Sequence, residues 1–164
     1  MKMKYIIIGI IILLVIIVLF IISNKKKVEI SEIKSFYFHY SVNNMMNGYV
    51  SYNIDCKNTC KARVKLNGIA EEEAVEVNIN NKDIKELTNI LEKYNISSWN
   101  GFDKVDKNVL DGNGFGLSII FKNGDSISAS GYMKWPENYG KVCTAFDNYF
   151  NNLLKKRGKW YGIW

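Results

Sequence analysis

The chain opens with a long apolar run and continues as short segments in which apolar and polar residues alternate. The run extends from Tyr5 to Ile22 and contains no charged residue. As a helix it would be about 27 Å long at about 1.5 Å per residue, close to the hydrocarbon thickness of a bilayer. Every side of such a helix is apolar, so no side of it suits contact with solvent. The run therefore predicts one transmembrane helix, a single-pass anchor.

A buried core helix and cleavage of this run as a signal peptide are the alternative interpretations. The absence of any charged residue in the run argues against a core helix. The run is longer than the core of a usual signal peptide, and the segment Ile21 to Lys25 has no small-x-small cleavage site. No Cys stands at its end to accept a lipid. We therefore expect an uncleaved anchor with basic flanks over residues 1–27.

Beyond the anchor, the period of the apolar residues predicts eight elements. Alternation indicates a strand, and apolar residues three or four apart indicate one face of a helix. The expected order is four strands (36–42, 50–56, 60–66, 75–79), a helix with its apolar stripe over 84–94, two strands (117–121, 127–129) and a helix with its stripe over 142–153. Asn80 and Pro136 are the expected starts of the two helices.

This order predicts an α+β domain over residues 28–158. Strands that alternate, rather than being apolar throughout, indicate an antiparallel sheet with one covered face. Each helix has a single apolar stripe, so both helices should lie on that face as the second layer. Residues 159–164 form a tail that includes Trp160, Tyr161 and Trp164. The tail is either a frayed terminus or a segment whose aromatic side chains lie in the headgroup region of the membrane.

Positive charge is concentrated beside the predicted anchor. The chain carries 22 basic and 16 acidic residues, a formal net charge of +6. Lys2, Lys4 and the three lysines 25–27 flank the apolar run. From Val28 onward the chain therefore contains 17 basic and 16 acidic residues. A nearly neutral domain argues against a nucleic acid as a partner.

The lysines on the two sides of the anchor nearly balance, so the positive-inside rule does not decide its orientation. A short basic start before an apolar run is typical of export signals, and this favours an exported domain. A domain that faces the cytoplasm is the alternative.

Few residues suit catalysis or metal binding. His39 is the only histidine, which excludes a multi-histidine metal site, and its place in the alternation puts it on the polar side of a strand. Asp103, Asp106, Asp111 and Asn113 lack the spacing of an EF-hand and its final Glu. We expect no bound metal and no cofactor.

Two segments should meet to form a binding surface. The turn Asn123-Gly124 makes the last two strands antiparallel neighbours, so segments 97–114 and 132–136 should meet at the end of the sheet opposite the turn. Aromatic residues beside carboxylates on converging loops are the usual composition of a recognition site. The candidate binding residues are Trp99, Phe102, Asp106, Asp111, Trp135 and Glu137. In the alternative, structural interpretation the two tryptophans close the end of the core and Asp111 caps a turn.

Cys56 and Cys60 bracket a loop of three residues between two predicted strands. In a hairpin they would lie nearly opposite each other, within reach of a disulfide. We expect the disulfide if the domain is exported, and a reduced pair is the alternative. Cys143 should be a free, buried helix residue.

Several distinct short motifs lie between about Ile79 and Phe150. They are Trp99-Asn100-Gly101-Phe102, Val109-Leu110-Asp111-Gly112, the hairpin, Ser130-Gly131 and Trp135-Pro136-Glu137-Asn138-Tyr139. On these motifs the chain resembles a family of uncharacterised bacterial small domains that carry an export signal, a lipoprotein signal or a membrane anchor. This chain departs from the lipoprotein members in having a plain anchor. The resemblance implies an exported domain and implies no activity.

Together these observations favour a membrane-tethered, exported bacterial domain that binds a protein or envelope partner without catalysis. One alternative is a hydrolase that acts on cell-envelope glycans through two carboxylates at a fixed separation. Another is an accessory protein on the cytoplasmic side of the membrane, which requires the inverted anchor.

The orientation has a direct test. If the domain from Val28 onward lies outside the cytoplasmic membrane, protease added to intact cells digests it, because the membrane does not shield it. The measurement is the loss of full-length protein on an immunoblot, with a cytoplasmic protein as the control for intact membranes. Protection until the membrane is opened would show the inverted orientation.

Overall fold

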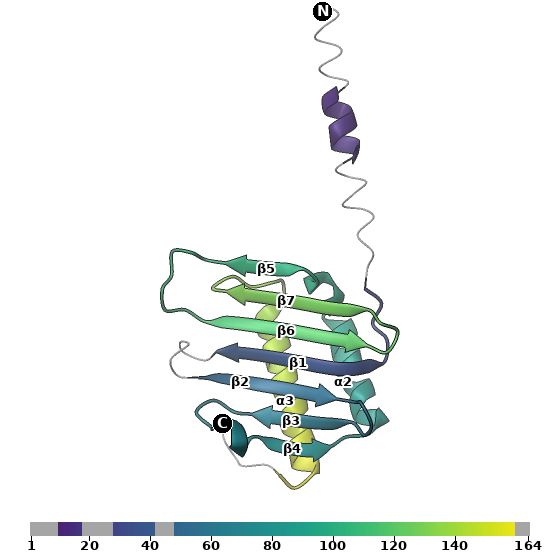
Figure 1. Cartoon of the computed structure of the whole chain (residues 1–164), viewed down its shortest axis with the longest axis vertical. Helices are drawn as coiled ribbons and strands as arrows, with labels where there is room; N and C mark the ends of the chain where they lie inside the picture. The colour runs from purple at the N-terminus through teal and green to yellow at the C-terminus, as the bar shows by residue number, and fades with distance from the viewer. Residues whose placement is uncertain (1–9, 18–27, 42–47, 160–164) are drawn as a thin grey trace, which may run out of the picture.

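The computed structural model describes residues 10–17, 28–41 and 48–159. The elements are, in chain order, β1 (Ile33–Ser41), β2 (Tyr49–Asp55), β3 (Lys61–Lys65), η2 (Glu71–Glu73), β4 (Val75–Asn78), α2 (Asn81–Lys93), η3 (Ile96–Trp99), β5 (Phe102–Val105), β6 (Gly114–Phe121), β7 (Ser126–Tyr132) and α3 (Tyr139–Lys156). Figure 1 labels the strands and the helices α2 and α3. The strands form one sheet in the order β4-β3-β2-β1-β6-β7-β5, and α2 and α3 lie on one face of it (Figure 1). The α+β class expected from the sequence is confirmed.

Strand β1 is the middle strand of this sheet and shows why the sheet has two unlike faces. Phe36 and Phe38 point to the helix layer and are at most 1% exposed, whereas Tyr37 between them is 36% exposed. The rings of both phenylalanines lie within about 5 Å of the ring of Phe146 on α3, at 5.2 and 5.1 Å between centroids. The alternation thus fixes one face for the core and leaves the other face open.

Helix α2 begins where the sequence predicts it. The side-chain oxygen of Asn80 accepts hydrogen bonds from the backbone N–H groups of Lys82 and Asp83, at 3.0 and 3.1 Å. The side chain of Asp83 in turn accepts a hydrogen bond from the backbone N–H of Asn80 at 3.0 Å, which completes a capping box. Asp83 also pairs with Arg157 at 2.8 Å, so the start of α2 is fastened to the end of α3.

The sheet differs from the expected one by a seventh strand, so the expectation of an entirely antiparallel sheet is wrong. β5 lies within segment 97–114 and pairs parallel with β7, which makes the sheet mixed. Three of its four residues are exposed, because β5 is an edge strand. Four residues that are mostly exposed carry too little alternation to reveal a strand in the sequence.

Most of the predicted anchor lies outside the described residues. Residues 10–17 are helical, and their apolar side chains are between 44% and 58% exposed. The flanking residues 1–9 and 18–27, like residues 160–164 of the predicted tail, are not among those described. In the described part of the chain, no helix combines the length and the apolar character needed to cross a membrane.

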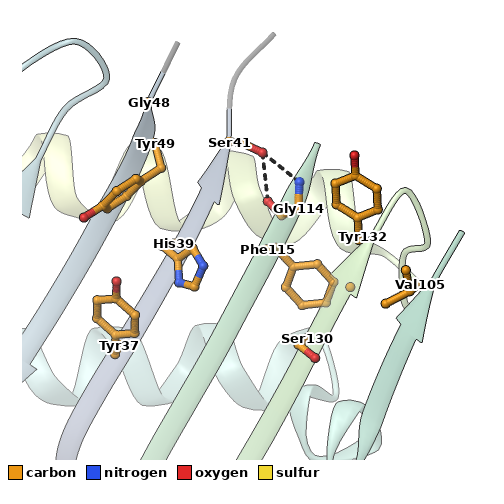
Figure 2. A pocket seen from close by; sticks show the side chains of 11 residues that line it. Tyr37, His39, Ser41, Gly48, Tyr49, Val105, Gly114, Phe115, Ser130 and Tyr132 are labelled. Carbon is orange, nitrogen blue, oxygen red and sulfur yellow. Dashed lines mark hydrogen bonds between the residues drawn. The ribbon is translucent and has the colours of Figure 1, made fainter. Parts of the chain in front are cut away.

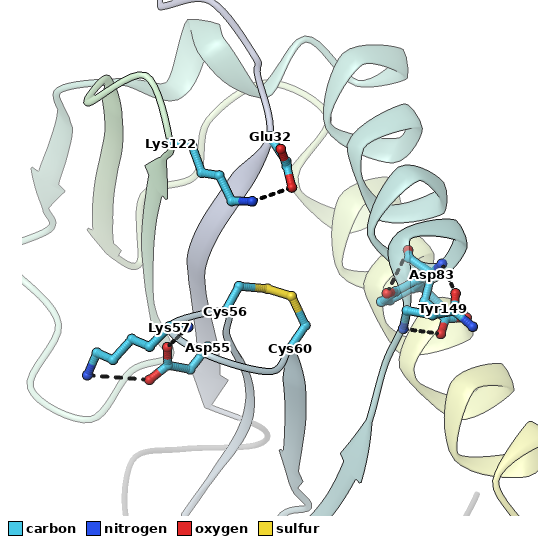
Figure 3. Close-up of a disulfide and its surroundings, with 9 residues drawn as sticks. Glu32, Asp55, Cys56, Lys57, Cys60, Asp83, Lys122 and Tyr149 are labelled. Carbon is cyan, nitrogen blue, oxygen red and sulfur yellow. Dashed lines mark hydrogen bonds and ion pairs between the residues drawn. A yellow bond between two sulfur atoms is a disulfide. The ribbon is translucent and has the colours of Figure 1, made fainter.

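Cys56 and Cys60 form a disulfide that joins the end of β2 to the start of β3 (Figure 3). Both cysteines also take part in backbone pairing. The N–H of Cys56 donates to the carbonyl of Lys34, and the carbonyl of Cys60 accepts from the N–H of Ile79, each at 3.0 Å. Cys143 has a free thiol and is half-buried, and this burial raises its pKa to about 12.

Asp147 is a carboxyl group on α3 that faces the covered side of the sheet. It accepts hydrogen bonds from the hydroxyls of Tyr40 and Tyr52, at 2.8 and 2.7 Å. Burial raises the pKa of Asp147, and the two hydroxyl donors lower it by less than burial raises it. The folded chain therefore holds the proton of Asp147 more tightly than the unfolded chain does.

This shift fixes the sign of a pH dependence. Because the folded-state pKa of Asp147 lies above the unfolded value of about 3.9, its contribution to stability is largest at low pH and is lost as the pH rises through the folded-state pKa. In Asp147→Asn that loss disappears, so the free energy of unfolding of the variant relative to the unchanged protein should increase from about pH 4 to pH 7. Urea unfolding at each pH measures both proteins, and a difference that stays constant or decreases would contradict the shift.

Candidate functional site

The face of the sheet away from the helices carries a hollow of about 490 Å³ (Figure 2). Five neighbouring strands contribute to it at the end where β1, β5 and β7 finish and β2 and β6 begin. The residues that line it are Tyr37, His39, Ser41, Gly48, Tyr49, Val105, Gly114, Phe115, Ser130, Gly131 and Tyr132. Its volume lies in the range of about 300–1,000 Å³ that is usual for ligand pockets.

Two glycines of β6 lie on the open face, Gly114 in the lining of the hollow and Gly116 beneath the ring of His39. Gly116 lies between His39 and Ser130 across the sheet, and Gly114 is opposite Tyr132 on β7. These two positions of β6 on the open face therefore have no side chain, while the strands on both sides carry larger ones. A Cβ atom on Gly116 would lie 2.3 Å from Cε1 of His39, so the imidazole leans over the space that a side chain would occupy.

One wall of the hollow is a row of aromatic rings from β1 and β2. The centroid of the His39 ring lies 5.3 Å from that of Tyr37 and 5.9 Å from that of Tyr49. Figure 2 shows these three rings on one side of the hollow, with Tyr132 and Val105 on the other. Aromatic side chains supply large, rigid contact surfaces, so this wall is suited to binding a flat ligand.

The opposite wall is held in place by hydrogen bonds. The hydroxyl of Tyr132 accepts from the N–H of Gly112 at 2.7 Å and donates to the carbonyl of Leu110 at 2.8 Å. Ser41 fastens the upper edge, because its hydroxyl accepts from the N–H of Gly114 at 2.7 Å and donates to the carbonyl of the same residue at 3.3 Å (Figure 2). The hollow is thus formed in advance of any ligand.

His39 contributes a buried polar atom with unused hydrogen-bonding capacity to the hollow. Its Nδ1 is buried and has no hydrogen-bond partner in the described part of the chain. A buried polar atom without a partner is costly, and such atoms in folded proteins often mark functional positions. Burial also lowers the pKa of His39, so the imidazole is neutral at pH 7.

The six binding residues predicted from the sequence lie at the same end of the sheet as the hollow. Most of them are on the opposite face, in the layer that contains the helices. The two segments do meet, since Asp106 pairs with Lys134 at 3.1 Å and the N–H of Met133 donates to the carbonyl of Asn113 at 2.9 Å. Phe115 is the link to the hollow, because it lines the hollow and also packs against the candidate aromatics.

The three aromatic candidates differ in exposure. Trp99 is 1% exposed, and its indole N–H donates to the backbone carbonyl of Glu137 at 3.1 Å, so it closes the end of the core. Trp135 is 39% exposed and stacks on Tyr139 at 4.6 Å between ring centroids. Phe102 is half-buried, 6.1 Å from the ring of Phe115. Only Trp135 of the three has a large exposed surface to offer a ligand.

The three carboxylate candidates do not converge on one point. Asp106 accepts from the N–H of Asn108 at 3.1 Å, and this bond together with Lys134 lowers its pKa. Asp111 and Glu137 are exposed. Among the described residues, no group of three His, Cys, Asp or Glu side chains is placed to hold a metal ion.

Reasoning from sequence missed the residues that line the hollow because it looked for aromatics on loops. Tyr37, Tyr49 and Tyr132 are strand residues on the polar side of the alternation, where a tyrosine is unremarkable by itself. The signal that could have found them is the pair Gly114 and Gly116, two residues apart in a strand. Glycine inside a strand marks a bulge or a place where something approaches the backbone closely.

Comparisons with known proteins add no assignment to this site. No protein-family model matches the chain, and a search of curated proteins finds no match. The function is therefore argued from the geometry and chemistry of the site itself.

The different exposures of the two tryptophans give unequal effects on stability. Trp99→Ala should lower the free energy of unfolding by about 3–5 kcal/mol, the range for removing a buried aromatic side chain. Trp135→Ala should lower it by about 1 kcal/mol, the value of one aromatic pair near the surface. Chemical denaturation of both variants measures the difference, and equal losses would contradict the assignment of Trp99 to the core and Trp135 to the surface.

Proposed function

We propose that this chain is a membrane-tethered, exported binding module that holds a ligand in the hollow on the open face of its sheet. The observation that carries the proposal is the hollow itself, whose aromatic wall includes His39 with a buried Nδ1 that has no hydrogen-bond partner among the described residues. A concave site with aromatic walls and a few polar groups is the usual form of a ligand site.

Two features support the proposed location of the domain, anchored to the membrane and exported. The uncharged run from Tyr5 to Ile22, with lysines on both sides, favours a membrane anchor. The disulfide between Cys56 and Cys60 favours an oxidising compartment outside the cytoplasm, because cytoplasmic thiols are kept reduced. The resemblance to bacterial anchored and lipoprotein-like domains agrees with this location.

The geometry favours binding over glycan hydrolysis. A glycosidase needs a protonated carboxyl group with a raised pKa and a second carboxylate across a cleft. Asp106 has a lowered pKa and an ion pair with Lys134, which is the wrong direction for a general acid. The residues that line the hollow include no Asp or Glu.

Crosslinking from a defined position tests the proposed site. Val105 is 57% exposed at the rim of the hollow, and Ile120 is 41% exposed on the same face of the sheet, near the other end of β6. A photo-crosslinking phenylalanine derivative at position 105 of the full chain should form an adduct with envelope material in living cells. The same derivative at position 120 is the matched control and should not form that adduct.

A second substitution shows whether the adduct depends on the hollow. Tyr49→Ala removes part of the aromatic wall and should abolish the adduct from position 105. Identical adducts from positions 105 and 120, or an adduct that survives Tyr49→Ala, would show that the hollow is not the binding site.

A further inference from the structure

The described residues that line the hollow carry no charged side chain. None of the 11 residues that line it is Lys, Arg, Asp or Glu. Charged groups close to the lining have partners of their own. Lys65 lies 4.1 Å from the centre of the Tyr49 ring, and Asp103 accepts a hydrogen bond from the hydroxyl of Ser130 at 2.6 Å. Glu71, whose charge helps to raise the pKa of Tyr37, pairs with Arg63 at 3.2 Å. An anionic ligand would lose its water here without gaining a cation, so the hollow favours an uncharged molecule.

The walls offer flat apolar surfaces on two sides. Tyr37, His39 and Tyr49 form the row of rings described above, and Tyr132 stands opposite them (Figure 2). Both hydrogen-bonding functions of the Tyr132 hydroxyl are occupied by the backbone, so this residue offers only its ring. A ligand between these walls needs an apolar face.

Neutral polar groups stand beside those surfaces. The hydroxyls of Tyr37 and Tyr49 and the imidazole of His39 form no side-chain hydrogen bond with any described residue. Burial raises the pKa of Tyr37 and lowers that of His39, so both are uncharged at pH 7. They can donate and accept hydrogen bonds without adding charge.

A pyranose ring has the properties that these surfaces require: an apolar face of C–H groups, hydroxyls around its edge and no charge. We propose that the hollow binds a neutral saccharide, an inference that rests on the proposed binding function and specifies its ligand class. The sugar face packs on the rings of Tyr37, His39 and Tyr49. Its hydroxyls exchange hydrogen bonds with the two phenols and the imidazole.

The only histidine of the chain provides a local probe. In the full-length protein, purified without a histidine tag, the imidazole resonances of a ¹H–¹⁵N spectrum come from His39 alone. The detergent must have no sugar headgroup, because a glycosidic detergent would itself present the proposed ligand. Titration with cellotriose and with chitotriose should shift the His39 resonances in a saturable way, and trigalacturonate, which is anionic, should not shift them.

Substitutions separate ring packing from a general effect on the fold. Tyr49→Ala should weaken binding of the neutral trisaccharide at least about tenfold, because it removes a central contact surface. Tyr49→Phe keeps the ring, so its affinity for the neutral trisaccharide should decrease much less. Ile120→Ala, on the same face near the hairpin, is the matched control and should bind as the unchanged protein does.

The outcomes distinguish the ligand class from the binding function. If neither neutral trisaccharide shifts His39 while the crosslink from position 105 still depends on Tyr49, the saccharide inference is overturned and the binding site stands. If that crosslink is absent as well, both fail. Binding of trigalacturonate as tightly as the neutral sugars would overturn the selection for an uncharged ligand.

Discussion

The packing of Phe36 and Phe38 of β1 against Phe146 of α3 fixes which face of the sheet belongs to the core. Because side chains alternate along a strand, the same contact directs Tyr37 and His39 to the open face. A shift of β1 by one residue relative to its neighbours would exchange these two sets of side chains. The core and the hollow are therefore two consequences of one register, and a substitution that disturbs the register should change both.

Much of the fold could be predicted because its signals are local. Helix α2 has a capping residue, an acidic residue in its first turn and one apolar stripe, and all three act within a few residues of each other. The meeting of segments 97–114 and 132–136 also followed from a local feature, the turn Asn123-Gly124. β5 could not be predicted, since its identity as a strand depends on the edge of β7, which forms only after β6 and β7 have paired.

The candidate site could be predicted only in part, because exposure is not a local property. Trp99 and Trp135 look alike in the sequence, yet one is enclosed by Phe115, Tyr139 and the carbonyl of Glu137, and the other lies at the surface. The hollow is formed by residues that are neighbours on adjacent strands and not along one strand. The ring of His39 on β1 lies over Gly116 on β6, which is opposite Ser130 on β7, and no single strand contains that information.

The pairing of β1 with β6 has a consequence for the folding of the site. The aromatic wall comes from Tyr37, His39 and Tyr49, and the opposite wall comes from Val105 and Tyr132, so the two walls come from distant parts of the chain. They approach each other only when β1 pairs with β6, whose partners Tyr37 and Ser118 are separated in the sequence by β2, β3, β4, helix α2 and β5. Contacts so distant in sequence close a long loop and are expected to form slowly. Occupancy of the hollow would then report completed folding, since a chain that has formed only its first hairpins or only its last hairpin has one wall of the hollow and lacks the other.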